Sequence, residues 1–144
     1  LDKTVDKKGN VVKDYQPELR NEITEVSDST WNAVQQGMED MVSTTGTFDS
    51  LRLEGFQMAG KTGTAQNPHG ADNSTFFCFA PRNNPKIAVS VYIENGGFGA
   101  TVAAPIASLL TELYLTDTIQ RAPLVEYVKN KQIAYPYYER QQRK

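Results

Sequence analysis

Hydrophobic and polar residues alternate cleanly over residues 87–93 in the middle of the chain. Because successive side chains of a β-strand point to opposite faces of a sheet, this period of two predicts a strand. Two further strands are predicted before it, at residues 57–66 and 74–80, and turn residues separate all three. The connection between the second and third strands, residues 81–85, is short and rich in turn formers. These two strands are therefore predicted to pair antiparallel.

A period near 3.6 residues predicts two helices that flank the strands. The first covers residues 29–43, with Ser27 or Ser29 as its cap. It carries an apolar stripe that we expect in the core: Trp31, Val34, Met38, Met41 and Val42. The second begins near Ala103 and accommodates Pro105 in its first turn. It directs the larger apolar side chains to one side, namely Ile106, Leu109, Leu110, Leu113 and Tyr114.

Shorter elements are predicted around these five. Residues 4–12 form a hairpin that turns at Lys8-Gly9-Asn10, and residues 14–25 form an exposed connection. Gly46 ends the first helix, and residues 67–73 form a loop at the rim of a cleft. A short amphipathic piece is predicted at residues 124–128, followed by a polar tail at residues 135–144. The pattern indicates an α+β fold, an antiparallel sheet of three to five strands with both helices packed on it, as part of a larger domain.

Composition and charge narrow the function classes. The chain has 144 residues, 39% of them hydrophobic and 22% charged, which suits one globular core. Its 15 basic and 17 acidic residues give a net charge of −2 without blocks of one sign, so the sequence gives no support to nucleic-acid binding. No apolar run approaches the roughly 20 residues that span a bilayer. The start at Leu1 suggests a piece of a longer protein.

Cysteine and histidine are too few for several common kinds of site. Cys78 is the single cysteine, which excludes an internal disulfide, and its phenylalanine neighbours predict a thiol packed in the core. His69 is the single histidine and lies in a polar loop, so neither a zinc site nor a Ser-His-Asp triad is expected. Residues 94–97 are interpreted as a turn, since one carboxylate is too few for calcium.

One motif in the first predicted strand carries candidate chemistry: Gly60-Lys61-Thr62-Gly63-Thr64. Thr62 and Thr64 share one face of a strand and offer two hydroxyls, while Lys61 adds a positive charge, a combination suited to a carboxylate. Gly63 lets the backbone of a ligand lie against the strand, and an N–H exposed at the strand edge stabilises a developing oxyanion. A solvated surface strand with a bulge at the glycine is the other interpretation of the motif alone.

The motif and its surroundings resemble the penicillin-binding proteins and serine β-lactamases, which share Ser-x-x-Lys, Ser-x-Asn and Lys-Thr-Gly motifs. The likeness runs through residues 27–115 in order, and it is strongest to class B proteins of the elongation type, penicillin-binding protein 2. The similar segments are Ser29-Thr30-Trp31, Gly37-Met38 with Val42, Gly46-Thr47, Lys61-Thr62-Gly63, Phe79-Ala80-Pro81, residues 84–89, Glu94-Asn95-Gly96 and residues 103–107.

The resemblance implies a serine-type D,D-transpeptidase of peptidoglycan synthesis, with no cofactor. Lys61 would support the polar network of the second motif. Thr62 and Thr64 would hold the terminal carboxylate of a D-alanyl-D-alanine stem peptide, and the N–H of Thr64 would be one oxyanion donor. Lys61, Thr62, Gly63 and Thr64 together form the implied substrate-binding strand, and penicillins would occupy the same groove as mimics of the peptide.

Departures from the family pattern limit what this chain can do alone. Neither Ser-x-x-Lys nor a preceding Ser-x-Asn occurs in the 144 residues, so the chain carries no nucleophile and is expected to be inactive by itself. Where the family often has His-Ala-Trp-Phe, this sequence has Asn73-Ser74-Thr75-Phe76, which predicts a different contact on an outer strand.

The resemblance also sets expectations for the whole protein. Residues 1–117 would be the C-terminal portion of a transpeptidase domain, and residues 118–144 a partly mobile C-terminal extension. The parent protein would be anchored at the periplasmic face of the bacterial inner membrane, and its partners would be peptidoglycan stem peptides, β-lactams and proteins of the cell-elongation complex. Without the other motifs' subdomain, apolar surface is expected to be uncovered, which favours self-association of the chain.

Alternative functions remain open at this point. An exposed strand edge also suits a noncatalytic module that binds a peptide or a partner protein. A β-lactamase or a β-lactam sensor shares the same motif set, and a small structural domain without a ligand is a further alternative. Peptide binding without acylation would favour the module, and hydrolysis of a β-lactam by the parent protein would favour a β-lactamase.

Overall fold

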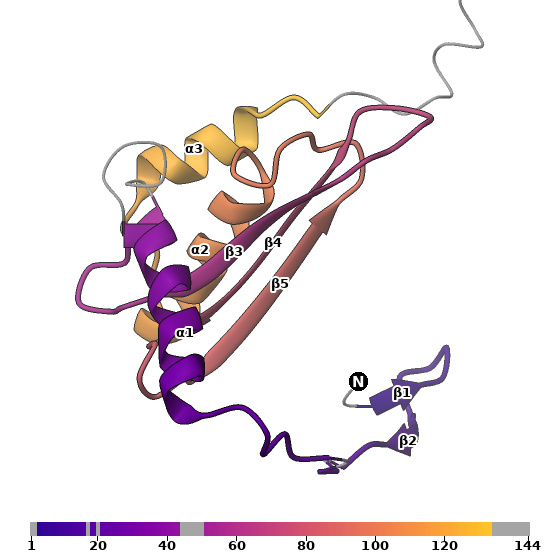
Figure 1. Ribbon diagram of the computed structural model, residues 1–144. Helices are drawn as coiled ribbons and strands as arrows, with labels where there is room; N and C mark the ends of the chain where they lie inside the picture. The colour runs from indigo at the N-terminus through magenta and orange to yellow at the C-terminus, as the bar shows by residue number, and fades with distance from the viewer. Residues whose placement is uncertain (1–2, 17, 20, 44–50, 134–144) are drawn as a thin grey trace, which may run out of the picture.

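The fold is an antiparallel sheet with helices on one face and along one edge (Figure 1). The computed structural model describes residues 3–16, 18–19, 21–43 and 51–133. Its elements in chain order are β1 (Lys3–Val5), β2 (Val11–Asp14), α1 (Asp28–Ser43), β3 (Ala59–Ala65), β4 (Asn73–Ala80), β5 (Ile87–Ile93), α2 (Ala103–Thr116) and α3 (Ala122–Asn130). The α+β class is confirmed. The predicted end of α1 at Gly46 and the tail at 135–144 lie outside the described residues.

Three strands form the main sheet in the order β3-β4-β5, each pair antiparallel. The predicted pairing of the second and third strands is therefore confirmed. Ser74, Phe76, Cys78 and Ala80 of β4 are buried on the face that α2 covers, where the Cys78 Sγ lies 3.5 Å from the Thr111 hydroxyl. The predicted core position of Cys78 is confirmed.

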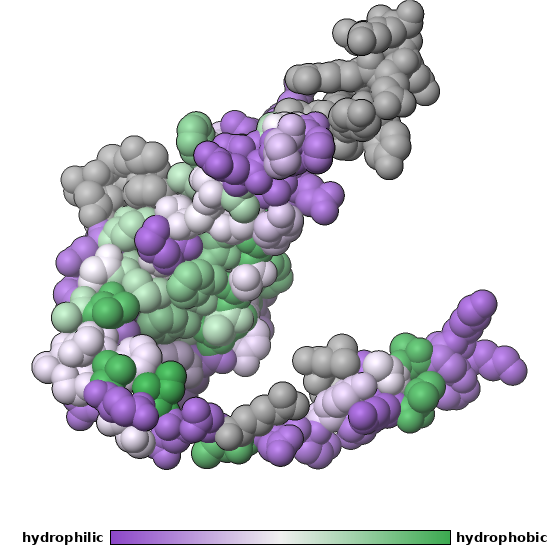
Figure 2. Space-filling view, turned by 45° about the vertical axis from the view of Figure 1, so that its right-hand side comes forward, coloured by the Kyte–Doolittle hydropathy of each residue, from purple (hydrophilic) through white to green (hydrophobic). Residues whose placement is uncertain are grey.

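The opposite face of the sheet is open. Phe77 and Tyr92 lie on it with 49% and 56% of their surface exposed, although both are large aromatic side chains. Thr75 is the cross-strand partner of Tyr92, and Thr75 and Phe77 are two residues apart on β4, so Phe77 and Tyr92 share one face of the sheet. Lys61, the cross-strand partner of Phe77, starts from the same face. Figure 2 agrees, since it shows a broad hydrophobic surface over the middle of the molecule between polar ends. Among the described residues, no helix or strand covers this face.

The helix α2 corrects one prediction. Its larger apolar residues were expected to lie together on one side of the helix. Leu109 is buried and Ile106 is half-buried, but Leu110, Leu113 and Tyr114 are exposed. The side that meets the sheet consists mainly of small residues: Ala103, Ala104, Ala107, Ser108 and Thr111. Small side chains let the helix axis approach the strands closely, and a helix that is apolar around most of its circumference does not reveal from its pattern which side is buried.

The apolar stripe predicted for the helix α1 is buried only in part. It begins at Asp28, and the Ser27 Oγ accepts a hydrogen bond from the Thr30 N–H at 3.3 Å, which confirms a serine cap. Its predicted core stripe reaches the core only at its end: Val42 is buried and Met41 packs partly, whereas Trp31 is 42% exposed and Val34 is also exposed. The helix contacts β3 at one end of the sheet (Figure 1), and its earlier turns meet Arg82, which follows β4: the Arg82 guanidinium lies 3.4 Å from the Asn32 carbonyl and 3.3 Å from the Glu39 carboxylate.

The predicted hairpin is confirmed and lies apart from the sheet in Figure 1. Gly9 has a φ of 87°, as the turn requires. The Asp6 carboxylate accepts hydrogen bonds from the N–H groups of Lys8 and Asn10 at 2.8 and 2.9 Å. The Asn10 side-chain amide donates a further hydrogen bond to this carboxylate at 3.0 Å. These three bonds, of which the one from the Asn10 side chain has the largest effect, hold the pKa of Asp6 below its usual value.

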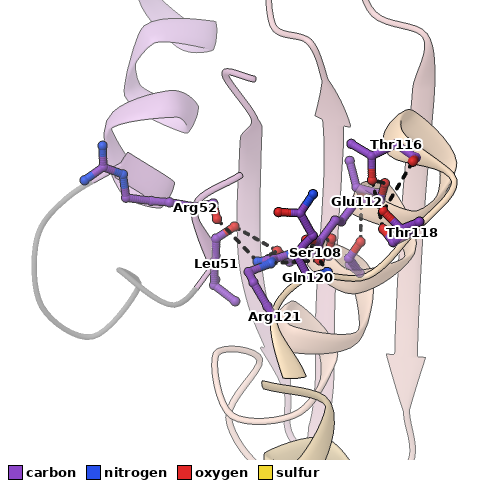
Figure 3. A network of polar contacts seen from close by, with 10 residues as sticks. Leu51, Arg52, Ser108, Glu112, Thr116, Thr118, Gln120 and Arg121 are labelled. Atoms are coloured by element: carbon purple, nitrogen blue, oxygen red, sulfur yellow. Dashed lines mark hydrogen bonds and ion pairs between the residues drawn. The ribbon is translucent and has the colours of Figure 1, made fainter. Parts of the chain in front are cut away.

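A polar network fastens α3 and the segment before β3 onto α2 (Figure 3). The guanidinium of Arg121 contacts the Glu112 carboxylate at 2.9 Å and donates to the Ser108 hydroxyl at 2.7 Å and the Ser108 carbonyl at 2.9 Å. The Ser108 hydroxyl in turn donates to the Leu51 carbonyl at 2.7 Å. The chain entering β3 is thus held by the helix that covers the sheet, and the amphipathic piece predicted at 124–128 is confirmed as α3.

Candidate functional site

The motif Lys61-Thr62-Gly63-Thr64 lies in β3, at the edge of the main sheet. Within the described part of the chain, only β4 pairs with it. Its first residues, Ala59 and Gly60, are buried, while Lys61 and Thr64 are exposed. The strand therefore begins in the core and then presents the motif to solvent along an unpaired edge, where a ligand backbone can pair.

The two threonines of the motif share one face, as predicted. Thr62 lies opposite Phe76 and Thr64 lies opposite Ser74, both on the side of the sheet that α2 covers. Thr62 is half-buried and Thr64 exposed, so neither hydroxyl faces a sealed interior. The pair remains available to an anionic group that approaches the edge.

Lys61 starts from the other, open face, but its side chain folds back along the strand. The Lys61 ammonium donates a hydrogen bond to the Thr62 carbonyl at 2.8 Å. The positive charge therefore lies at the backbone of Thr62, on the strand that carries both threonine hydroxyls. A cation and hydroxyl donors are groups with which proteins commonly bind a carboxylate.

Gly63 is required by packing as well as by ligand approach. A Cβ built on Gly63 would collide with the Thr75 hydroxyl of the neighbouring strand. A side chain here would require the Thr75 side chain to turn, so the glycine leaves room for the Thr75 hydroxyl where it lies. The space that the Thr75 hydroxyl needs was not predictable from the alternation along β3.

Sequence reasoning also missed Ser74, which is fully buried in β4, opposite Thr64 of the motif strand. Its hydroxyl donates to the Phe98 carbonyl at 3.0 Å and accepts from the Ala103 N–H at 3.1 Å. A polar residue at an inward position of a strand, in line with Phe76 and Cys78, is the signal that would have found it.

The loop after β3 is joined to the turn after β5. The Asn67 side-chain amide donates to the Asn95 side-chain oxygen at 3.1 Å, and the Asn95 N–H donates to the Asn73 side chain at 3.0 Å. Asn95 and Gly97 have positive φ angles of 56° and 74°, which confirms a turn at residues 94–97. His69 is exposed in the loop, and its N–H donates to the Asn67 side chain at 3.0 Å.

Other chemistries find little support among the described residues. Burial raises the pKa of the Cys78 thiol, so this group is a poor nucleophile. In residues 3–16, 18–19, 21–43 and 51–133, no three His, Cys, Asp or Glu side chains are grouped to hold a metal ion. None of the helices in those ranges has the length and apolar character needed to cross a bilayer.

Comparison with known proteins places this arrangement in a family. The family model "Penicillin binding protein transpeptidase domain" matches residues 3–112. The peptidoglycan D,D-transpeptidase MrdA of Haemophilus influenzae is 34% identical over 136 residues, which is 82% of this chain and 20% of that protein.

Solved structures agree with the sequence comparison. Pseudomonas aeruginosa PBP2, in a complex with WCK 5153, superposes with a TM-score of 0.54 at 33% identity, over 85% of this chain and 26% of that one. The ceftriaxone acyl-enzyme of Mycobacterium tuberculosis penicillin-binding protein A gives a TM-score of 0.57 at 25% identity, over 76% and 26%.

The Lys-Thr-Gly motif on an edge strand of an α+β sheet and the similarity to these proteins define the class of this chain. The chain belongs to the penicillin-binding protein transpeptidase domain family, and within it to the class B proteins of the penicillin-binding protein 2 type. The resemblance drawn from the motifs is therefore confirmed. The chain covers about a fifth of the length of the Haemophilus relative.

Proposed function

We propose that this chain supplies the substrate-binding edge strand of a peptidoglycan D,D-transpeptidase whose nucleophilic serine lies elsewhere in the whole protein. The observation that carries the proposal is the position of Lys61–Thr64 on an unpaired strand edge, with the ammonium folded against the strand at 2.8 Å from the Thr62 carbonyl. The relative MrdA is named as such a transpeptidase, which supports the same reaction class.

In the proposed reaction, a serine hydroxyl loses its proton to a neighbouring base and attacks the carbonyl carbon of a D-alanyl-D-alanine stem peptide. The peptide bond breaks, D-alanine leaves with a proton on its amine, and an acyl-enzyme remains. The amine of a second stem peptide then attacks the ester carbonyl, which releases the serine and forms the cross-link. A β-lactam would acylate the same serine through its ring amide.

Each motif residue has a distinct role in this proposal. Thr62 and Thr64 donate hydroxyl hydrogen bonds to the terminal carboxylate of the stem peptide, and Lys61 adds charge and supports the second motif. The N–H of Thr64 stabilises the oxyanion that forms at the attacked carbonyl. Gly63 permits the peptide backbone to pair with β3 at close range.

Substitution of Lys61 tests the proposal. In the full-length protein, Lys61→Ala is expected to lower the rate of acylation by a fluorescent penicillin by about a hundredfold, because a charge positioned for the transition state is removed. Lys86→Ala is the matched control, since Lys86 is an exposed lysine in the turn between β4 and β5 and should leave the rate unchanged. Equal acylation of the Lys61 variant and the wild type would contradict the proposal.

The finer organisation of the protein is also proposed here. Residues 1–117 belong to the transpeptidase domain and residues 118–144 form a C-terminal extension. The parent acts at the periplasmic face of the inner membrane with proteins of the cell-elongation complex. The isolated chain, which lacks a Ser-x-x-Lys motif, is inactive and self-associates through its open sheet face.

The open edge of β3 also favours a second candidate, a noncatalytic module that binds a peptide by strand addition. The two candidates differ in the covalent step. Stem-peptide binding by the full-length protein without any acylation by penicillin would support the module, and hydrolysis of penicillin with rapid turnover would instead support a β-lactamase or sensor.

A further inference from the structure

A close approach between two backbone segments lies directly behind the motif strand. Gly99 is buried, and a Cβ built on it would stand 2.5 Å from the Gly63 carbonyl oxygen and still closer to the Thr75 carbonyl oxygen. Both atoms belong to the backbone and cannot swing aside as a flexible side chain can. The glycines of the described residues with positive φ are Gly9, Gly55 and Gly97, so Gly99 is required here for space and not for its conformation.

The segment that carries Gly99 is anchored on both sides. On one side, the Phe98 carbonyl accepts hydrogen bonds from the hydroxyls of Ser74 and Thr101 at 3.0 and 2.7 Å. On the other, the Ala103 N–H donates to the same Ser74 hydroxyl at 3.1 Å, and the Ala104 N–H donates to the Gly99 carbonyl at 3.0 Å. This segment therefore cannot retreat easily, whereas β3 pairs with a single strand in the described part of the chain and is easier to displace.

The contact falls on the peptide unit that matters for the chemistry. The Gly63 carbonyl and the Thr64 N–H belong to one planar peptide, so a force on the carbonyl oxygen also turns the N–H. Gly63 lies opposite Thr75, and the carbonyl oxygens of both residues lie close to one point beside Gly99. Both oxygens therefore point between the two strands. Because the C=O and N–H of one peptide point in opposite directions, the Thr64 N–H points away from β4 to the free edge.

We infer that Gly99 is a positioning residue for the transpeptidation site: it lets residues 97–104 pack against the Gly63–Thr64 peptide and so fixes the direction of the Thr64 N–H. The inference rests on the function proposed above, in which that N–H is an oxyanion donor. Gly99 itself touches neither substrate nor serine. Its effect is transmitted by one rigid peptide unit of the edge strand.

The experiment compares Gly99→Ala with Gly37→Ala in the full-length protein, using stopped-flow acylation by a fluorescent penicillin. Gly37 is exposed on α1, and apart from its own helix backbone no described residue lies within 4 Å of its Cβ position, so the same chemical change there should leave acylation at the wild-type rate. For Gly99→Ala, the first-order acylation rate constant is expected to fall about tenfold to a hundredfold, because a shift of about 1 Å near the reacting atoms costs that much. The dissociation constant of the noncovalent complex should change much less, since hydroxyl contacts to the carboxylate tolerate small shifts.

The outcomes separate the two proposals. A wild-type protein that is never acylated overturns the proposed function and this inference with it. Acylation of wild type and Gly99→Ala with equal rate constants overturns the inference alone. If Gly99→Ala does not fold, Ser74→Ala decides, because it frees the segment on both sides of Gly99 without adding an atom: a reduced acylation rate constant supports the inference, and a wild-type value overturns it.

Discussion

Cys78 shows at the scale of a single residue how the surroundings decide what a side chain does. Burial disfavours the thiolate and raises the pKa of the thiol, although hydrogen bonds from Thr111 and the Val89 backbone partly offset this. As pH rises, the unfolded chain therefore loses the thiol proton first, near the ordinary value of 9.0. The contribution of Cys78 to stability is present below that pH and is lost above it.

This predicts slow labelling of the native thiol. At pH 8, an aromatic disulfide reagent should modify the folded chain at least about tenfold more slowly than the chain in denaturant, because the thiolate is disfavoured and the sulfur is inaccessible. Cys78 is the only cysteine, so the absorbance of the released thiolate reports on this site alone. Labelling of the native chain as fast as the unfolded chain would contradict the burial of Cys78 in solution.

Some residues of the candidate site could be predicted from the sequence pattern, and others depend on their tertiary surroundings. The strand position of Lys61, Thr62 and Thr64 was predictable because alternation along β3 assigns their faces. The roles of Ser74 and Gly99 were not, since both depend on a segment more than 20 residues away in sequence that packs behind β3. A single sequence carries no direct record of such contacts.

At the scale of elements, α2 and α3 are joined by an ion pair that is largely shielded from water. The side chains of Arg121 and Glu112 are 20% and 10% exposed, and the same guanidinium holds Ser108. The pair Lys129–Glu126 lies on the surface of α3, with 65% and 63% exposure. The two pairs differ in burial and in the number of elements that they connect, so they should differ in energy.

Removal of one basic partner from each pair should separate these cases. Arg121→Ala leaves the Glu112 carboxylate without its partner and is expected to lower the free energy of unfolding by about 2 kcal/mol or more. Lys129→Ala, the matched control, should change it by less than about 1 kcal/mol. Urea unfolding followed by circular dichroism measures both, and equal effects of the two substitutions would contradict the central role assigned to Arg121.

For the whole molecule, the main feature is the sheet face that no described helix or strand covers. Phe77 and Tyr92 are exposed there, and Figure 2 shows hydrophobic surface around the middle of the molecule. A contiguous apolar surface of this kind usually marks a contact with another part of a protein or with another copy. The chain spans about a fifth of the length of its Haemophilus relative.

For the isolated chain, we expect concentration-dependent self-association by light scattering. Phe77→Glu, which places a charge on the open face, should shift the population toward monomer because burial of that charge in a contact is costly. Val12→Glu is the control, since Val12 is an exposed apolar residue on the separate hairpin. A monomer at all concentrations, or an equal effect of both substitutions, would rule out association through this face.

The sequence by itself determined the elements, the strand that carries Lys61–Thr64 and the family, because periodicity, turn residues and ordered motifs are local properties of the chain. Tertiary structure alone decided which sides of the helices are buried: α2 meets the sheet with alanines, and Trp31 of α1 is exposed. It also decided that β3 lies at an edge backed by Gly99. These features depend on close packing between distant segments, where the space left by one backbone fixes what the other can be.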